Sequence, residues 1–207
     1  MWYAIVIVAV TAYLLGSLNG AVIASHLFAK EDVRQKGSGN AGLTNFVRNY
    51  HSRGVVLVIL IDAGKAVAAC LLGGFLLKPY GFWLEGATLG GTCLMIGHDF
   101  PVFLRFKGGK GIFSGLFIAL TIDWRIAVLI LAVFVLAYFT TKYVSLGSVL
   151  ASLAFAAGFV IFHYDNLSVA IGGVIMGLLA VFMHRGNIAR LIKGQERKTD
   201  FFAKKKK

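Results

Sequence analysis

The chain has 207 residues, of which 58% are hydrophobic and only 14% are charged, and its mean hydropathy is +0.78. A soluble domain is roughly 45–50% apolar, so this composition excludes an ordinary soluble protein and indicates one embedded in a membrane. The formal net charge of +12 would indicate a nucleic-acid partner only in a basic soluble domain, and the apolar pattern leaves no room for one.

Apolar segments recur through the whole chain. Crossing a membrane takes about 20 consecutive apolar residues, and most of these segments approach that length. One of them, 112–122, rises only about 16 Å as a helix at 1.5 Å per residue. The sequence therefore predicts an all-α polytopic integral membrane protein that forms a single membrane-embedded domain over residues 1–207. Its seven predicted transmembrane helices, one or two of them short, are 2–18, 55–77, 82–97, 112–122, 126–141, 144–162 and 167–183.

The basic residues predict the orientation of these spans. If Met1 lies outside, all but three of the 21 Lys and Arg residues fall on the cytoplasmic side, many of them in the basic tail at 197–207. The exceptions are Lys65 within a span and Lys78 and Arg125 outside. The positive-inside rule then predicts an external N-terminus and a cytoplasmic C-terminus.

Further expectations concern the chain ends and the cysteines. The first apolar segment has no basic stretch before it and no Ala-x-Ala sequence after it, so we expect it to stay in the mature protein rather than to act as a signal peptide. The four lysines at 204–207 either contact anionic lipid or are an addition to the natural chain.

Cys70 and Cys93 lie in apolar segments without metal-ligand spacing and are expected in the core.

The first long polar segment, 34–49, is rich in glycine and small polar residues. Glycine permits positive φ and lets a ligand approach the backbone closely, and the planar guanidinium of Arg48 suits a phosphate. The alternative is a flexible turn with a helix N-cap at Thr44 or Asn45. The candidate binding residues of this segment are Gly37, Ser38, Gly39, Asn40, Thr44, Asn45 and Arg48.

The second polar segment, 97–115, contains Gly-Gly-Lys-Gly directly before an apolar helix. Free backbone N–H groups at the start of that helix would form an anion site, to which the lysine would add a full positive charge. The segment is not a Walker A loop, which would need glycine at Leu104 and Ser or Thr at Gly111. The alternative is an ordinary loop whose lysine faces lipid. The candidates here are Gly108, Gly109, Lys110 and Gly111.

The third polar group lies near the C-terminus. His184, Asn187 and Arg190 recur at three-residue intervals, which places them on one face of a helix that leaves the membrane. Ser145, at the start of an apolar segment, and Glu196 complete the group. In the predicted topology all three polar groups share the cytoplasmic side.

Other ionisable residues carry weaker patterns. Asp62 and Lys65 lie three residues apart inside a span and must pair or face a polar cavity, so we expect a buried structural pair rather than a direct substrate role. Asp99 either orients the imidazole of His98 or caps a helix. The remaining histidines, to which no chemistry is assigned, are His26, His51 and His163.

The three polar groups are rich in cations and exposed amides but contain no paired carboxylates. No His-Glu-x-x-His sequence, cysteine ladder or aspartate cluster appears, so neither metal-assisted hydrolysis nor metal-dependent phospho-alcohol transfer finds its ligands. The expected ligand is an anion with a phosphate head and an apolar tail, bound at the cytoplasmic face of the membrane.

Three stretches of the sequence resemble the signature motifs of one family. They are GSGNAGLTN at 37–45, GHDFPVFLRFKGGKG at 97–111, and SLGS at 145–148 followed by H-x-x-N-I-x-R-L-x-x-G-x-E at 184–196. In this order, and across nearly the whole chain, they are similar to the motifs of the bacterial acyl-phosphate:glycerol-3-phosphate acyltransferases, the PlsY type. Leu43 departs from the alanine that is usual in the family, but the change removes no polar group.

The resemblance implies an enzyme that transfers a fatty acyl group from acyl phosphate to the 1-hydroxyl of glycerol 3-phosphate. The products would be phosphate and lysophosphatidic acid, in the first acylation of phospholipid synthesis. The resemblance also implies seven spans in the bacterial inner membrane, an external N-terminus, an active site on the cytoplasmic face, and no metal or cofactor. Acyl phosphate, glycerol 3-phosphate and membrane lipid would be the partners, without nucleic acid.

The same resemblance suggests how phosphate would be held. Lys110, Arg48 and the amides of 108–111 would bind phosphate, and Ser38 would hydrogen-bond the reacting end of the acyl phosphate. Ser38 would act either as a binding hydroxyl, with direct attack by the acceptor, or as a nucleophile that forms an acyl-enzyme. We favour direct attack, because no base is adjacent to Ser38 in the sequence.

The remaining roles concern the acceptor. His184 and Asn187 would position glycerol 3-phosphate. Either His184 or the donor phosphate would take the proton of the attacking hydroxyl, and the local sequence does not distinguish the two.

A transporter for a phosphorylated metabolite is the alternative function. It would also need cationic helices broken by glycine. The predicted external turns are short and carry few charges, however, and no inverted repeat is visible, so we favour the acyltransferase.

Overall fold

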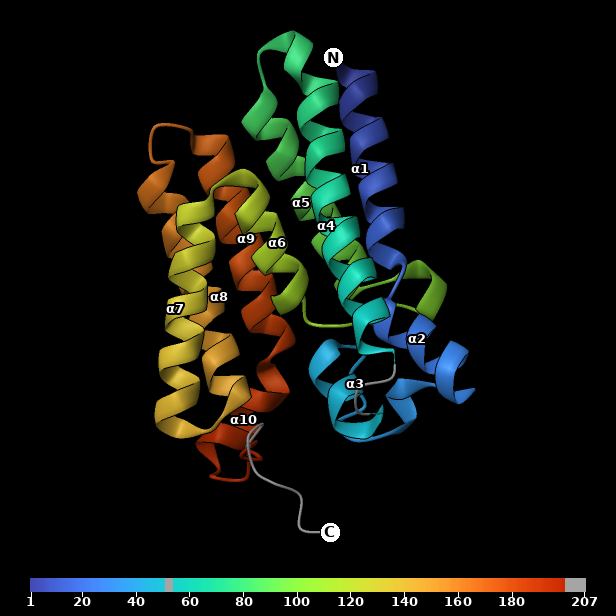
Figure 1. The fold of residues 1–207 in the computed structure, drawn as a ribbon. Coiled ribbons are helices and arrows are strands. Elements are labelled where there is room, and N and C mark those ends of the chain that lie inside the picture. Colours follow the sequence, from blue (N-terminus) through green and yellow to red (C-terminus); the bar gives the residue numbers. More distant parts are fainter. Residues whose placement is uncertain (51–53, 200–207) are drawn as a thin grey trace.

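The computed structural model describes residues 1–50 and 54–199, and every regular element within these residues is a helix (Figure 1). All seven predicted spans are helical. The helix predicted to leave the membrane at His184–Arg190 is α10, a helix begins near the suggested N-cap at Thr44 as α3, and α2 was not predicted. His51 and the four lysines at 204–207 lie outside the described residues. The helices are α1 (Trp2–Ser17), α2 (Gly20–Ala29), α3 (Leu43–Tyr50), α4 (Val55–Leu77), α5 (Trp83–Asp99), α6 (Ile112–Ile122), α7 (Trp124–Thr141), α8 (Val144–Phe162), α9 (Leu167–Met183) and α10 (Arg185–Ile192), with short 3₁₀ turns η1 (Val33–Gln35), η2 (Lys78–Tyr80) and η3 (Val102–Leu104).

The helices differ in their apolar length. Four stretches of the described chain are long and apolar enough to cross a membrane, and α9 and α10, which meet at 55°, make a fifth if they are counted together. The helices α5 and α6 have only 17 and 11 residues. The all-helical membrane fold is thus confirmed, and the count of seven spans stays a prediction. The four stretches are Trp2–Ala29, Val55–Tyr80, Trp124–Thr141 and Val144–Phe162.

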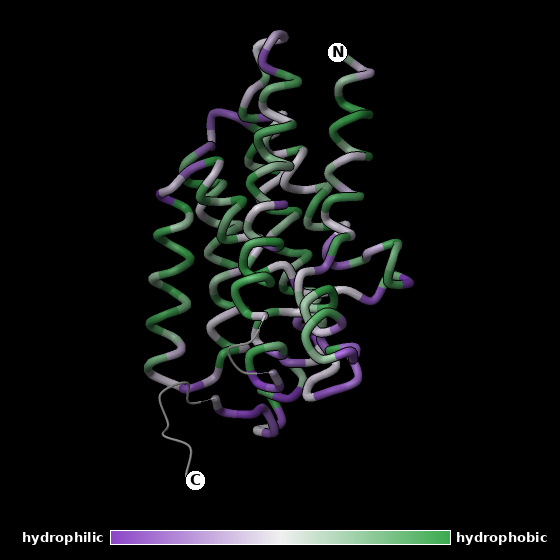
Figure 2. Tube along the Cα trace, turned by 45° about the vertical axis from the view of Figure 1, so that its right-hand side comes forward, coloured by the Kyte–Doolittle hydropathy of each residue, from purple (hydrophilic) through white to green (hydrophobic). Residues whose placement is uncertain are grey.

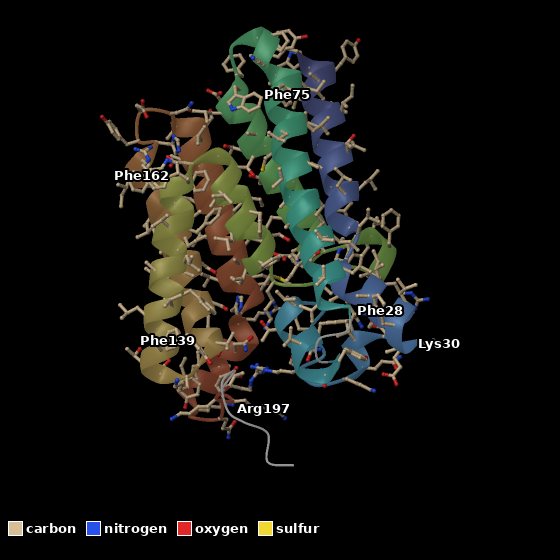
Figure 3. All side chains as sticks on the ribbon, viewed as in Figure 1. Phe28, Lys30, Phe75, Phe139, Phe162 and Arg197 are labelled. Carbon is tan, nitrogen blue, oxygen red and sulfur yellow. The ribbon has the colours of Figure 1, made fainter. Side chains whose placement is uncertain are left out.

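Hydropathy changes along the long direction of the molecule. The middle of the bundle is hydrophobic and polar residues gather at its two ends (Figure 2). Met1 and the start of α1 lie at one end, with Phe75 and Phe162, whereas α3, α10 and Arg197 lie at the other (Figures 1 and 3). The polar segments around α3 and α10 are therefore neighbours at one end of the bundle.

The backbones of α1, α4 and α5 touch one another. A Cβ atom on Gly73 of α4 would lie 1.9 Å from the carbonyl oxygen of Gly86 in α5. On Gly16 of α1, a Cβ atom would lie 2.1 Å from the carbonyl oxygen of Leu94 in α5. Glycine is required at these crossings because it alone lets the helix backbones approach so closely.

The helices α6 to α9 form the second part of the bundle. Ile118, Phe155, Phe159 and Met176 are buried in the core that joins the two parts. The predicted core positions of the cysteines are confirmed, since Cys70 belongs to this core and Cys93 packs against it.

One histidine without an assigned role has a partner. His163 Nε2 lies 3.3 Å from Oδ2 of Asp123, which also pairs with Arg125 at 2.6 Å. This cluster joins the start of α7 to the end of α8. It lies at the end of the bundle marked by Phe162 in Figure 3, away from α3 and α10.

The break between α1 and α2 fixes the first polar segment in place. Leu18 is extended, with φ −74° and ψ 117°, which interrupts the helix. The side chain of Asn19 accepts a hydrogen bond from the Val22 N–H at 3.0 Å and donates one from Nδ2 to the Ala41 carbonyl oxygen at 2.9 Å. Asn19 therefore caps α2 and attaches the loop before α3 to the membrane helices.

Candidate functional site

A cavity of ≈ 550 Å³ lies at the end of the bundle that contains α3 and α10. Its walls come from the loop before α3, α3 itself, the start of α6, α7, the start of α8 and the junction of α9 with α10. Gly39, Gly108 and Gly109 are the predicted site residues that do not line it. The predicted residues that do are Gly37, Ser38, Asn40, Thr44, Asn45, Arg48, Lys110, Gly111, Ser145, His184, Asn187 and Glu196.

Asn45 organises the first polar segment from inside. Its side chain is buried, and Nδ2 donates to the carbonyl oxygens of Val33, Lys36 and Asn40, each at 3.0 Å. Its Oδ1 accepts the backbone N–H of Ser38, also at 3.0 Å. These bonds differ from the predicted substrate-binding role, because the amide of Asn45 is already engaged by the loop, and they make it a positioning residue for Ser38.

The glycines beside Ser38 have conformational roles. Gly37 and Gly39 have φ of +62° and +71°, a region that favours glycine. A Cβ atom on Gly37 would also lie 2.3 Å from Asn45 Oδ1. Ser38 itself is exposed, and its hydroxyl has no hydrogen-bond partner among the described residues, so no neighbouring base activates it in this structure.

Arg48 connects α3 to the C-terminal segment 195–199. Its guanidinium donates a hydrogen bond from Nη2 to Oγ1 of Thr199, and the Thr199 N–H donates to the Lys142 carbonyl oxygen at 3.0 Å. The segment therefore passes beside the cavity, and its residues Gln195 and Arg197 line the wall. Sequence analysis missed these two residues, since only Glu196 between them belongs to a recognisable pattern.

The glycine loop before α6 differs from the prediction at two of its amides. The N–H of Gly108 donates to the Asp99 carbonyl oxygen at 3.2 Å, and that of Gly109 donates to the His98 carbonyl oxygen at 3.0 Å. These amides are engaged by the end of α5 and are not free for phosphate. Lys110 and Gly111 make no such backbone bond in the described chain, and both line the cavity, so the predicted anion site reduces to their two amides and the lysine ammonium.

Lys110 reaches across the cavity to α10. Its Nζ donates a hydrogen bond to Oδ1 of Asn187, whose Nδ2 donates to Oε1 of Glu196 at 2.9 Å. Burial, reinforced by the positive charge of Arg190, lowers the pKa of Lys110 to about 8, while the charge of Glu196 opposes the shift. The ammonium therefore carries its charge at neutral pH but loses it in mildly alkaline solution.

Glu196 is the one carboxylate from the third polar group. Its Oε2 accepts a hydrogen bond from Nε of Arg190 at 2.7 Å. Burial would raise the pKa of Glu196, but the hydrogen bonds from Asn187 and Arg190 outweigh this and lower it. Glu196 is thus an anion that holds Asn187 and Arg190 in place.

His184 lies at the junction of α9 and α10 and is buried. Its Nδ1 lies 2.8 Å from the Ala180 carbonyl oxygen. A carbonyl oxygen only accepts, so Nδ1 carries the proton and Nε2 of the neutral ring has the free lone pair. Burial lowers the pKa of His184 to about 4, an effect that the Ala180 hydrogen bond opposes and the charge of Lys110 reinforces. The ring is therefore uncharged at neutral pH, and Nε2 is its unprotonated nitrogen.

The predicted buried pair of Asp62 and Lys65 is confirmed. Nζ and Oδ1 are 2.9 Å apart, and each side chain is 3% exposed. Lys65 also donates to the carbonyl oxygens of Gly16 and Leu18, at 3.2 Å and 2.5 Å, which the break after α1 leaves without a helical partner. Asp62 in addition lines the cavity, which was not predicted.

His98 has a different partner from the one predicted. Its Nδ1 lies 2.9 Å from Nζ of Lys65, and the ring lines the cavity. Asp99 does not orient this imidazole, and neither of its carboxylate oxygens has a hydrogen-bond partner among the described residues, although both are buried. Sequence analysis gave His98 no cavity position, because the polar partner that faces it comes from another helix.

Part of the cavity wall is apolar, and it comes mainly from α6, α7 and α8. The cavity as a whole therefore suits an amphiphile with an anionic head and an apolar chain. The apolar residues that line it are Ile112, Phe113, Leu116, Ile130, Leu131, Phe134, Val144 and Ala151.

Comparisons with known proteins identify the family of the chain. The family model described as glycerol-3-phosphate acyltransferase matches residues 6–194. The chain is 38% identical over 193 residues to the glycerol-3-phosphate acyltransferase of Thermoanaerobacter pseudethanolicus, with 93% of this chain and 94% of that one covered. It is 37% identical over 197 residues to the protein of the same name from Clostridioides difficile, with 95% and 96% covered.

Two solved structures are similar in fold. Both are crystal structures of PlsY (YgiH), an integral membrane glycerol 3-phosphate acyltransferase. Its glycerol 3-phosphate form has a TM-score of 0.82 and 31% sequence identity, and covers 95% of this chain and 96% of that one. Its lysophosphatidic acid form has a TM-score of 0.81 and 30% identity, with 95% of each chain covered.

Proposed function

Because the chain belongs to the glycerol-3-phosphate acyltransferase family, we propose that it transfers a fatty acyl group from acyl phosphate to the 1-hydroxyl of glycerol 3-phosphate. The products are 1-acyl-glycerol 3-phosphate, which is lysophosphatidic acid, and inorganic phosphate. Solved relatives named for their glycerol 3-phosphate and lysophosphatidic acid forms support the acceptor and the product. The family also favours this function over transport of a phosphorylated metabolite.

One observation carries the proposal. Side chains from loops far apart in the sequence surround one cavity, with Arg48, Lys110 and Arg190 at its polar end and an apolar wall beyond them. The cations match the phosphate groups of two substrates, and the apolar wall matches a fatty acyl chain. Acyl phosphate is a mixed anhydride and already activated, so the protein mainly has to position two anions and stabilise charge as phosphate departs.

A substrate phosphate is held in this proposal by Lys110, the free amides of Lys110 and Gly111, and Arg48. The exposed hydroxyl of Ser38 hydrogen-bonds the reacting end of the acyl phosphate. We favour direct attack over an acyl-enzyme, since no base lies against the Ser38 hydroxyl in the described chain. Gly37, Gly39, Asn40 and Thr44 shape the backbone around it.

In the transfer step the glycerol oxygen forms a bond to the acyl carbon. The bond from that carbon to the phosphate oxygen then breaks, and phosphate leaves with the electron pair. His184 accepts the hydroxyl proton at Nε2, which the bond from Nδ1 to Ala180 leaves unprotonated. Asn187, held by Glu196, and Ser145 line the acceptor side.

The membrane arrangement is also part of the proposal. The protein crosses the bacterial cytoplasmic membrane seven times, with an external N-terminus and a cytoplasmic C-terminus. The cavity then opens on the cytoplasmic face, where glycerol 3-phosphate is available. The excess of Lys and Arg in the loops around the cavity supports this orientation, as does the position of Met1 at the opposite end of the bundle.

An assay of the purified protein in detergent tests the function. The enzyme is given palmitoyl phosphate and labelled glycerol 3-phosphate, and a parallel reaction contains palmitoyl-CoA. Labelled lysophosphatidic acid is expected from palmitoyl phosphate alone, and equal product from palmitoyl-CoA would overturn the proposed donor.

Variants make the same assay specific for the site. Ser38→Ala and His184→Ala are expected to lose most activity. The matched controls Ser168→Ala and His26→Ala, which change exposed residues that do not line the cavity, keep it. Full activity in both site variants would show that these residues do not act as proposed.

A further inference from the structure

One cavity residue has no part in the proposed reaction. His98 lies at the end of α5 and is only 4% exposed, yet its ring lines the cavity where the glycine loop begins. A buried imidazole in this position is either a packing group or a ligand contact. Its hydrogen bonds decide which nitrogen can contact a ligand.

The partners of Lys65 determine the protonation of that imidazole. The ammonium contacts an anion, Asp62 Oδ1, at 2.9 Å, and the carbonyl oxygens of Leu18 and Gly16, at 2.5 Å and 3.2 Å. All of these groups accept hydrogen bonds, so Lys65 is held as a charged donor, and its three N–H groups are shared among four contacts. Its remaining contact, 2.9 Å long, is with Nδ1 of His98. An ammonium cannot accept a hydrogen bond, so Nδ1 supplies a lone pair and the proton of the neutral ring is on Nε2.

The protonated nitrogen faces the glycine loop. A Cβ atom on Gly109 would lie 2.1 Å from His98 Nε2, so only glycine leaves room for this edge of the ring. The loop is also attached to the same turn of α5 by the bond from the Gly109 N–H to the His98 carbonyl oxygen. The next residues, Lys110 and Gly111, carry the free amides that line the cavity. An anion bound at those amides would lie within two residues of Gly109, the residue that Nε2 faces.

The two cavity histidines therefore have opposite tautomers. His184 donates from Nδ1 to a carbonyl and has an accepting Nε2, whereas His98 accepts at Nδ1 and has a donating Nε2. The first suits a proton acceptor. The second suits a neutral donor to an anion, and it adds a hydrogen bond without placing a further positive charge beside Lys65.

We propose that His98 is a phosphate-binding residue, whose Nε2–H donates a hydrogen bond to an oxygen of the phosphate group held at Lys110 and Gly111, with Lys65 fixing the donating tautomer. The proposal rests on the proposed function for the identity of the phosphate, which belongs either to the acyl donor or to glycerol 3-phosphate. Lys65 is a positioning residue in this arrangement, since it acts through His98.

Two substitutions distinguish a hydrogen-bond donor role of His98 from a packing role. His98→Asn keeps an oxygen that can accept from Lys65 but removes the donor at the Nε2 position. His98→Gln places an amide N–H near the Nε2 position and loses the Lys65 contact. A hydrogen bond to a charged group contributes about 1.5–3 kcal/mol, or roughly 10- to 100-fold.

The kinetic comparison is made with palmitoyl phosphate and glycerol 3-phosphate varied in turn. His98→Asn should raise the KM of one of them at least about 10-fold, and His98→Gln should restore most of the loss. The substrate whose KM rises is the source of the phosphate. A KM unchanged for both substrates in His98→Asn, or a greater loss in His98→Gln than in His98→Asn, would refute the proposal.

A spectroscopic measurement remains decisive if both variants fail to fold. The wild-type protein is labelled with ¹⁵N-histidine, and its NMR spectrum is recorded with inorganic phosphate and, separately, with glycerol 3-phosphate. Single variants of the other four of its five histidines assign the His98 signals by elimination. We expect a protonated Nε2 and an unprotonated Nδ1, with the Nε2–H resonance shifted by one of the two probes.

Protonation at Nδ1, or an Nε2–H resonance insensitive to saturating amounts of both probes, would overturn the assignment. The measurement does not depend on acyl transfer. A phosphate response without any acyltransferase activity would leave the His98 site intact and reject the proposed function.

Discussion

Lys110 and Asn187, which are 77 residues apart, are joined by a hydrogen bond from Nζ to Oδ1 across the cavity. We expect Lys110→Met to lower kcat/KM for acyl transfer roughly 10- to 100-fold, because a hydrogen bond to a charged group contributes about 1.5–3 kcal/mol. Asn187→Leu should act on the same contact, so the double variant should lose less than the two single losses combined. A double-mutant cycle on kcat/KM measures this coupling.

Lys78→Met, an equivalent change in η2 after α4, at the end of the bundle away from the cavity, is the control for the lysine substitution and should leave kcat/KM unchanged. Strict additivity of the Lys110 and Asn187 effects would mean that the bond has no part in catalysis.

The pKa of about 8 for Lys110 predicts an alkaline decline in activity. Because the pKa is lowered, the ammonium is charged below about pH 8 and loses its charge as the pH rises through that value, which weakens anion binding. The kcat/KM for the substrate whose phosphate contacts Lys110 should therefore fall above pH 8, since this parameter reports the groups of the enzyme form that binds that substrate. Lys110→Arg should keep its charge and abolish the decline, whatever its absolute activity. An alkaline decline of the same shape in Lys110→Arg would assign the titration to another group.

Glu196 should set the pH at which kcat/KM begins to decline. Its negative charge raises the pKa of Lys110, in opposition to burial and Arg190. Glu196→Gln retains an oxygen that can accept from Asn187 but removes the charge, so the pKa of Lys110 should fall and the decline should begin at lower pH. The pH dependence of kcat/KM measures the shift. The control is Glu85→Gln. The Glu85 carboxylate accepts a hydrogen bond from Asn166 at the other end of the bundle, so this change should leave the pH dependence of kcat/KM unchanged.

The close crossing of α4 and α5 predicts a packing effect. Gly73→Ala would place a methyl group 1.9 Å from the Gly86 carbonyl oxygen, and overpacking of this kind costs about 1–3 kcal/mol. The melting temperature in detergent should fall by roughly 2–4 °C per kcal/mol for a chain of this size. Gly64→Ala is a matched control in the same helix, because nothing lies within 4 Å of its added methyl group. Equal melting temperatures for the two variants would contradict the crossing as described.

The positions of elements along the chain could be predicted from the sequence. Hydropathy changes sharply at the ends of α4 and α8, because each boundary separates residues suited to lipid from residues suited to water. Ser38, Lys110 and His184 belong to polar segments that the predicted topology and the family resemblance assign to one face of the membrane. In the structure all three residues line a single cavity.

The rotation of each helix about its axis could not be predicted. The helix α5 carries few polar residues, so the local sequence does not reveal that His98 faces Lys65 of α4 rather than its neighbour Asp99. The role of Asn45 was missed for a related reason, since it depends on three carbonyl groups whose directions follow from the folded loop. The helix α2 was missed because its first residues continue an apolar run beyond a break made by only Leu18 and Asn19.

The touching backbones of α1, α4 and α5 have a consequence for genetic screens of this chain. A methyl group added at Gly16 or Gly73 leaves every cavity side chain unchanged but removes the space on which the helix crossings depend. Such alleles should reduce the amount of protein in the membrane, whereas changes at Lys110 or His184 should leave normal amounts of an inactive protein. Immunoblots of membrane fractions would then sort loss-of-function alleles into two groups, and only the second would map the catalytic centre.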